Sequence, residues 1–123
     1  METINRAKYP GPKRRKYKRL NVYHLGVPIQ IKYNNDDILI PGILLNLSSG
    51  GLGILVFKKI DVGTRVNIKI SLHNLFTNNI KAKVVWIKEH ENTYSMGLEF
   101  IKITKRDREQ IKEFVEKHLK EDM

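Results

Sequence analysis

The sequence predicts an all-β domain with a small α-helical contribution: six short strands followed by one C-terminal helix. Apolar and polar residues alternate with period two through most of residues 25–100, as they do in half-buried strands. Clusters rich in Gly, Asn, Asp and Ser separate the alternating stretches. After residue 104 the apolar period becomes that of an amphipathic helix. Short strands with tight connections are typical of an antiparallel sandwich or a small barrel.

The first two strands are predicted to form a hairpin. Alternation over residues 25–33 indicates the first strand, and the polar residues 34–37 form a turn. The apolar run 38–45 indicates the second strand, bent or bulged where Pro41-Gly42 interrupts it. Both ends of such a hairpin return to the same edge of the sheet, so the residues before 25 and after 45 lie close together.

The remaining strands follow at short intervals. They are expected at residues 52–57, 65–72, 80–86 and 94–100, with connections at 58–63, 73–79 and 89–92. Most aromatic side chains, Trp86 among them, are expected on the apolar face of their strands. A helix over about 105–120 begins after Thr104, an N-cap answered by Asp107. It covers an open end or side of the sheet with one apolar face, formed by Ile111, Phe114, Val115, His118 and Leu119.

Length and composition indicate one domain at residues 13–123, preceded by a flexible lead-in at 1–12 that ends in Pro10-Gly11-Pro12. The absence of cysteine excludes a disulfide framework and a thiolate metal site. The longest apolar runs are far below the roughly 20 residues that a membrane span needs, and the N-terminus shows no export signal. We therefore expect a cytoplasmic protein without membrane insertion.

The positive charge is concentrated near the N-terminus. The chain has a formal net charge of +10. Residues 1–20 hold eight Lys or Arg and one acid, whereas residues 21–123 hold fifteen bases and twelve acids. The excess therefore belongs to a basic arm at 13–20, and such an arm is suited to grasping phosphates. A solvated basic tail is the alternative reading of this arm.

Two polar patterns meet at the base of the predicted hairpin. Arg15 and Arg19 lie just upstream of the first strand. Asn46 and Ser48 end the second strand and point to the same side of it, because side chains alternate with period two. Gly51 follows and lets a main chain or a ligand approach closely. The hairpin predicts one polar ligand site from these residues, although residues 46–51 are equally typical of a turn between strands.

No pattern in the sequence supports catalysis or metal binding. Asp36 and Asp37 are adjacent, which suits a turn better than an acid/base pair. Ser48 and Ser49 lack the strand–elbow–helix context of a nucleophile, and no phosphate-binding loop of the GxxxxGK[ST] type is present. No ligand-spaced neighbours surround the four histidines, which are His24, His73, His90 and His118. We therefore predict neither an enzyme nor a metal protein.

The chain resembles the PilZ domains, a family of receptors for the bacterial second messenger cyclic di-GMP. The family pattern is RxxxR followed, after roughly one hairpin, by [D/N]xSxxG. This chain has Arg15-Lys16-Tyr17-Lys18-Arg19 and then Asn46-Leu47-Ser48-Ser49-Gly50-Gly51. Arg14 matches an additional arginine that many members carry, and residues 96–100 followed by a charged helix look like the family's closing strand and C-terminal helix. The resemblance covers about residues 13–120.

The resemblance implies a six-stranded antiparallel β-barrel whose N-terminal arm folds over cyclic di-GMP. It assigns Arg15 and Arg19, with Arg14 assisting, to the phosphates and guanines of the ligand, which arginine binds bidentately or by stacking. Asn46 and Ser48 would hydrogen-bond a guanine edge or a phosphate, and Gly51 would let the backbone approach. Arg14 further implies a stacked ligand dimer. The chain would act as a signalling adaptor that is read by an unidentified protein partner, through ordering of its arm.

Two other functions are compatible with the sequence. A small basic β-barrel could bind nucleic acid nonspecifically, but it would need aromatic side chains along an exposed strand face as stacking platforms, which makes this the weaker reading. A degenerate module could keep the fold and mediate protein contacts only. The intact RxxxR and NxSxxG patterns argue against that alternative.

Overall fold

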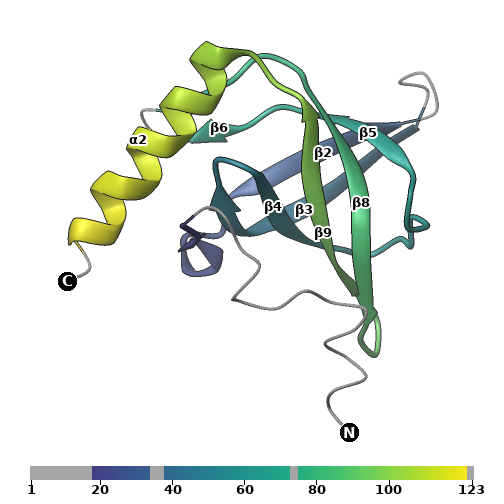
Figure 1. Ribbon diagram of the computed structural model, residues 1–123. Helices are drawn as coiled ribbons and strands as arrows, with labels where there is room; N and C mark the ends of the chain where they lie inside the picture. The colour runs from purple at the N-terminus through teal and green to yellow at the C-terminus, as the bar shows by residue number, and fades with distance from the viewer. Residues whose placement is uncertain (1–17, 34–37, 73–74, 122–123) are drawn as a thin grey trace, which may run out of the picture.

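The computed structural model describes residues 18–33, 38–72 and 75–121, and Figure 1 shows the arrangement of the elements. A short 3-10 helix η2 (Tyr23–Leu25) and the helix α2 (Lys105–Glu121) accompany the strands. The strands are β1 (Leu20–Asn21), β2 (Pro28–Tyr33), β3 (Ile38–Ser48), β4 (Gly51–Val56), β5 (Arg65–Ile68), β6 (Ser71–Leu72), β7 (Leu75–Phe76), β8 (Ile80–Glu89) and β9 (Tyr94–Lys102).

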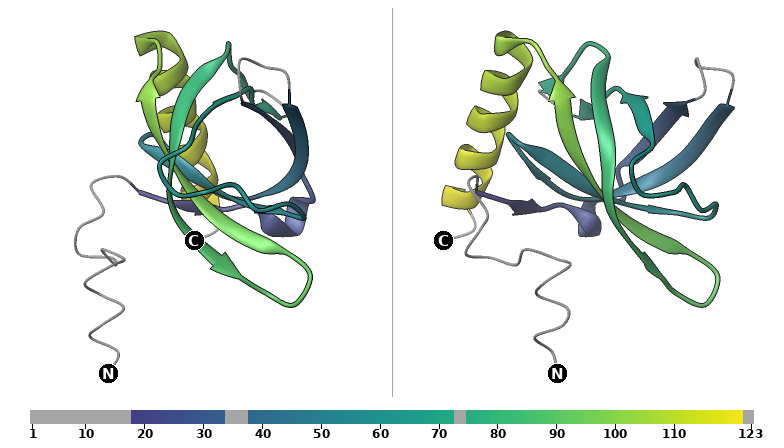
Figure 2. Two further views of the ribbon diagram at one scale, coloured as in Figure 1. Left: turned by 90° about the vertical axis from the view of Figure 1, so that its right-hand side faces the viewer. Right: turned by 45° about the vertical axis from the view of Figure 1, so that its right-hand side comes forward.

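Six of the strands close into an antiparallel barrel. The main sheet has the order β1-β3-β2-β5-β8-β9-β4. An additional pairing of β3 with β4 closes the six strands from β3 to β4 into a ring. β1 pairs with β3 outside the ring. The left view of Figure 2 shows the strands arranged around a common axis. The all-β fold with a C-terminal helix is confirmed, and closure decides for the barrel over the sandwich.

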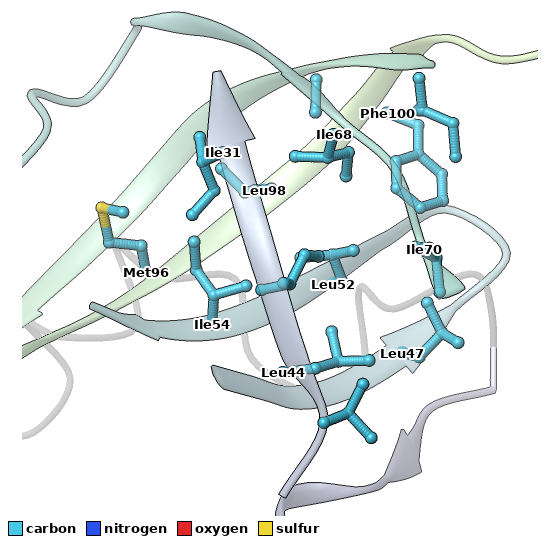
Figure 3. Close-up of a cluster of buried hydrophobic side chains, with 14 of the residues drawn as sticks. Ile31, Leu44, Leu47, Leu52, Ile54, Ile68, Ile70, Met96, Leu98 and Phe100 are labelled. Carbon is cyan, nitrogen blue, oxygen red and sulfur yellow. The ribbon is translucent and has the colours of Figure 1, made fainter. Parts of the chain in front are cut away.

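The interior of the barrel is filled by the apolar side chains of alternate strand positions (Figure 3). Ile31, Leu44, Ile54 and Met96 are fully buried and come from four different strands. Period-two alternation directs these side chains inward and their sequence neighbours outward. The outer face of the barrel is therefore left to polar residues, glycines and a few exposed apolar residues.

Three β-bulges interrupt this alternation, and the one on β9 lies between Phe100 and Lys102, where Ile101 is an extra residue. On β3 the partner of Leu44 is Ile54, and the partner of Asn46 is Gly53, so Leu45 is an extra residue. On β8 the partner of Val84 is Leu98, and that of Trp86 is Gly97, so Val85 is extra. An extra residue reverses the side to which the following side chains point.

The expected position of the irregularity in β3 was wrong. Pro41 and Gly42 lie in unbroken register opposite Gln30 and Ile29, and the bulge falls at Leu45 instead. Pro41 does not mark a bulge here, because it keeps its register position opposite Gln30. The local sequence around Leu45 carries no bulge signal, since Leu44-Leu45 is part of a continuous apolar run.

Two further boundaries differ from the expectation. The first strand was expected from residue 25, but η2 occupies Tyr23–Leu25 and Gly26 turns the chain with φ 62° before β2 begins. The fourth strand was expected to reach residue 72, with a loop at 73–79. β5 instead ends at Ile68, and β6 and β7 form a small hairpin. Leu75 of β7 is fully buried, which explains why this segment packs on the barrel.

Helix α2 begins at its expected cap. Thr104 Oγ1 accepts a hydrogen bond from the backbone N–H of Asp107, 3.1 Å away. Ile111, Phe114 and Val115 are buried on the face turned to the barrel, and α2 contacts β1, β3 and β7 (Figure 1). In the described part of the chain no helix is both long and apolar enough to cross a membrane.

Candidate functional site

β1 brings the residues that follow the basic arm to the side of β3. Leu20 lies opposite Leu47, and Asn21 lies opposite Asn46. Extending this antiparallel register by one residue places Arg19, which is half-buried, level with Ser48. The expected return of the upstream segment to the end of β3 is therefore seen for Leu20 and Asn21, which directly follow Arg19. Arg14 and Arg15 lie outside the described residues.

Asn46 lies on the outer side of the barrel, over the bare backbone of Gly53. A Cβ atom built at Gly53 would stand only 2.9 Å from Asn46 Nδ2 and 3.0 Å from Oδ1. Asn46 Oδ1 is buried, and among the described residues it has no hydrogen-bond partner. A buried acceptor without a donor is costly for the free protein. The site therefore offers an acceptor to a ligand that carries an N–H group.

On the neighbouring strands β8 and β9, Trp86 lies over Gly97 as Asn46 lies over Gly53. A Cβ atom at Gly97 would collide with the indole, so the ring lies against the backbone of Gly97 on the outer side of the barrel. The expectation that Trp86 faces the apolar interior was wrong, because the bulge at Val85 reverses its direction. A half-buried indole on an outer face is a surface on which a planar ring can stack.

These residues form one continuous row across five strands. Register pairs join Asn21 to Asn46, Asn46 to Gly53, Gly53 to Gly97, and Gly97 to Trp86. Residues paired across antiparallel strands point to the same side of the sheet. We call Asn46, Gly53, Gly97 and Trp86 the glycine shelf. Sequence reasoning missed Gly53, Gly97 and Trp86, although a glycine inside a strand is a recognised sign of close approach.

Ser48 stabilises the turn between β3 and β4. Its hydroxyl donates to the carbonyl of Gly51 and accepts from the backbone N–H groups of Gly50 and Gly51, each at 3.2 Å. The side chain is only 3% exposed. The hydroxyl therefore shapes the turn beside the glycine shelf, and the turn expected at residues 46–51 is present; a contact between Ser48 and a ligand stays a prediction.

Gly51 is required by the packing of the barrel itself. A Cβ atom at this position would collide with the backbone carbonyl of Leu98 on β9 and approach Cα of Glu99 to 3.2 Å. The close approach that only glycine permits is thus made by a neighbouring strand. A contact between Gly51 and a ligand stays a prediction.

Helix α2 and strand β9 fix the tip of the same turn. Arg108 donates from Nη1 to the carbonyl of Ser49 at 3.1 Å, and the N–H of Phe100 donates to the carbonyl of Gly50 at 3.0 Å. Asp107 is buried at the start of α2 and accepts through Oδ2 from the N–H of Asn78 at 3.1 Å. Sequence spacing gave no sign of these long-range bonds.

Two kinds of polar cluster are relevant to the surroundings of Asn46 and Ser48. No cluster of three or more His, Cys, Asp or Glu able to hold a metal occurs among them. His90 and Ser95 share a hydrogen bond of 2.9 Å between Nε2 and Oγ, but it lies in the β8–β9 hairpin, apart from Asn46 and Ser48.

The fold is similar to several solved structures. The PilZ domain of YcgR from Escherichia coli with c-di-GMP matches with a TM-score of 0.70 and 20% identity, over 89% of this chain and 96% of the other. The inhibitor of motility MotI/DgrA from Bacillus subtilis matches with a TM-score of 0.74 and 18% identity, over 87% of this chain and 52% of the other. These identities establish a shared fold.

Part of the similarity is to about half of a longer chain. MrkH of K. pneumonia, in a complex with c-di-GMP, matches with a TM-score of 0.71 and 11% identity, over 88% of this chain and 53% of the other. This chain thus spans about half the length of MotI/DgrA and of MrkH. No curated protein matches the sequence. The family model of the PilZ domain matches residues 13–117, which is most of the chain, and the chain therefore belongs to the PilZ domain family.

Proposed function

We propose that this protein is a receptor for cyclic di-GMP and that the ligand lies across the glycine shelf. The observation that carries the proposal is the buried, unpartnered Oδ1 of Asn46 in one row with the outward indole of Trp86. The similar structures of the YcgR PilZ domain and of MrkH described above contain c-di-GMP, which supports the same ligand class here. The ligand offers two planar guanines and two phosphates. The shelf binds the guanines, and the basic arm binds the phosphates.

Each residue has a role that follows from its chemistry. Guanine carries N–H donors on its edge, and Asn46 Oδ1 accepts from one of them. The base lies against Trp86 and the bare backbone of Gly97. Arg19 of the described residues, together with Arg14 and Arg15, binds phosphates or guanine edges bidentately. Ser48 holds the turn in shape.

Binding is coupled to the basic arm in this proposal. The like charges of residues 13–19 repel one another, and the ligand phosphates neutralise them. The arm then docks beside β1 and changes the surface that a protein partner reads. The protein acts as a non-enzymatic signalling adaptor, and its partner is a separate protein. Two ligand molecules stacked on each other fit the additional arginine, Arg14.

Calorimetry with cyclic di-GMP, GTP and a short oligonucleotide tests the proposal. Wild type is expected to release heat with cyclic di-GMP and to bind GTP much more weakly. Arg15→Ala and Asn46→Ala are expected to weaken binding at least tenfold, because each removes a direct ligand contact. Arg6→Ala is the matched control, since it removes one positive charge from the same N-terminal segment outside the RxxxR pattern.

A second readout is built into the chain. Trp86 is the only tryptophan, so fluorescence excited beyond the absorption of the five tyrosines reports on the shelf alone. Cyclic di-GMP is expected to change this emission in wild type and in Arg6→Ala. No heat with cyclic di-GMP, or equal loss of affinity in Arg6→Ala and Arg15→Ala, overturns the proposal. Steeply salt-dependent affinity for the oligonucleotide would favour a nucleic-acid-binding barrel instead.

A further inference from the structure

A second positively charged region lies on the outer side of β5, β8 and β9, which are neighbours in the barrel (Figure 1). Arg65 lies opposite Lys83, and Lys81 lies opposite Lys102. Paired residues of antiparallel strands point to the same side, so these four bases share one face. We call it the basic face, and its bases are these four and Lys32 of β2, which lies opposite Asn67, the partner of Lys81. Glu99, opposite Lys83, is its one acid among the described residues, which leaves a net charge of +4.

Part of this arrangement costs the fold stability. Like charges placed directly opposite each other on neighbouring strands destabilise a sheet. The pairs Arg65–Lys83 and Lys81–Lys102 are both of this kind, and Glu99, opposite Lys83, offsets only the first. Opposed like charges are relieved by an anionic partner, and that makes the basic face a candidate for an interaction surface.

Two aliphatic side chains project from the same region. On β9, Lys102 pairs with Lys81 and Phe100 pairs with Ala82, so Ile101 is an extra residue that points outward and is 44% exposed. Val85, the extra residue of β8, is 38% exposed. Each bulge thus places one aliphatic group among the bases. A partner that meets this face is therefore both anionic and able to accept small apolar groups.

These features favour a membrane surface over a folded partner. A closed barrel has no free strand edge here to which a peptide could add. Two isolated aliphatic residues do not make the apolar centre of a stable protein interface. Nucleic-acid recognition favours arginine, whereas four of the five bases are lysine. A fluid anionic surface adapts to a convex face with lysines at several heights.

We propose that the basic face docks the barrel on the surface of a membrane that contains anionic phospholipid. The lysines lie at the headgroups, and Ile101 and Val85 enter the boundary between headgroups and acyl chains. The contact is peripheral and reversible. Lys81 and Lys102 lie outside the rows that contain Asn46 and Ser48, so a change at these two lysines tests the basic face apart from the proposed nucleotide site, whereas Lys83 and Arg65 continue the row of Ser48.

Sedimentation of the full chain with phosphatidylglycerol–phosphatidylcholine vesicles tests the proposal. The variant Lys81→Gln/Lys102→Gln is expected to bind at least about tenfold more weakly than wild type. Its melting temperature is expected not to fall, since the change removes a like-charge pair. Lys58→Gln/Lys59→Gln is the matched control: both lysines are exposed on the β4–β5 connection, and the charge removed is the same. The control is expected to lose less than about twofold.

The comparison of these two variants separates the basic face from the charged N-terminal segment, which both retain. Ile101→Ser, which keeps every charge, is expected to weaken vesicle binding severalfold. Equal losses in the two double variants, or no binding of wild type to anionic vesicles, would overturn the proposal. Loss of duplex-oligonucleotide binding in Lys81→Gln/Lys102→Gln with vesicle binding intact would also overturn it and assign the face to nucleic acid.

Discussion

Arg108 of α2 and Ser49 of the β3–β4 turn, 59 positions apart in the chain, are joined by a hydrogen bond of 3.1 Å from Nη1 to the backbone carbonyl. The bond ties the C-terminal helix to the turn that follows Asn46 and Ser48. A displacement of that turn therefore shifts the start of α2. A displacement of α2 likewise shifts the turn beside the glycine shelf.

We expect Arg108→Ala to lower the free energy of unfolding by about 1 kcal/mol and to weaken cyclic di-GMP binding severalfold, because the turn loses its link to α2. Thermal melting and calorimetry measure the two effects. Arg106→Ala is the matched control, since Arg106 is exposed on the same helix and the charge removed is equal. The same loss of affinity in both variants would indicate a general charge effect and contradict the structural link.

Ser48→Ala removes the acceptor of two backbone N–H groups and the donor to the Gly51 carbonyl. Because these groups are buried or half-buried, we expect a loss of about 1–3 kcal/mol in the free energy of unfolding. Urea unfolding measures the loss. Ser71→Ala, at an exposed position of β6, is expected to change it by less than about 0.5 kcal/mol. A Ser48→Ala protein as stable as wild type would show that the turn does not depend on this hydroxyl.

Substitutions of the two shelf glycines have distinguishable consequences. Gly97→Ala forces the Trp86 indole away from the backbone, and we expect the fluorescence of the free protein to change and ligand affinity to fall at least tenfold. Gly53→Ala moves the Asn46 amide instead. It is expected to weaken binding while leaving the emission of the free protein unchanged. Identical spectra for wild type and Gly97→Ala would mean that the ring does not lie on Gly97.

Asp107 is buried at the first turn of α2 and accepts a hydrogen bond from the N–H of Asn78. Asp107→Ala leaves that N–H without its acceptor, so the free energy of unfolding is expected to fall by about 1–3 kcal/mol. Asp107→Asn keeps an acceptor oxygen and should recover part of the loss. Glu109→Ala, at an exposed position two residues later, is the control for removal of a carboxylate from this helix. Equal melting temperatures for Asp107→Ala and Glu109→Ala would contradict this role.

The strands and the helix could be predicted because their apolar periods are regular. The alternating apolar residues Met96, Leu98 and Phe100 are buried as expected, and so is the apolar face of the helix around Phe114. The return of β1 to the end of β3 was also predictable, since a hairpin returns to the edge from which it starts. The resemblance in the RxxxR and NxSxxG patterns then selected the barrel and one family.

The shelf could not be predicted because it depends on bulges. Plain alternation places Asn46 and Trp86 on the core side of their strands, the side of Leu44 and Val84, and only the extra residues Leu45 and Val85 turn them outward. No local preference marks either extra residue, since both lie in continuous apolar runs. The bonds of Arg108 and Asp107 were hidden for another reason: their partners are distant in sequence and are backbone groups, which every residue carries.

The bulges at Leu45 and Val85 also bear on how such a binding surface can be gained or lost in evolution. Removal of a single codon, for Leu45 or for Val85, would restore plain alternation in that strand and turn Asn46 or Trp86 into the barrel interior. The RxxxR and NxSxxG patterns would remain intact in either deletion. The insertion or deletion of one residue therefore decides whether a barrel of this kind presents its binding residues to the outside. Such a change leaves both sequence patterns intact, so a comparison of the patterns alone misses it.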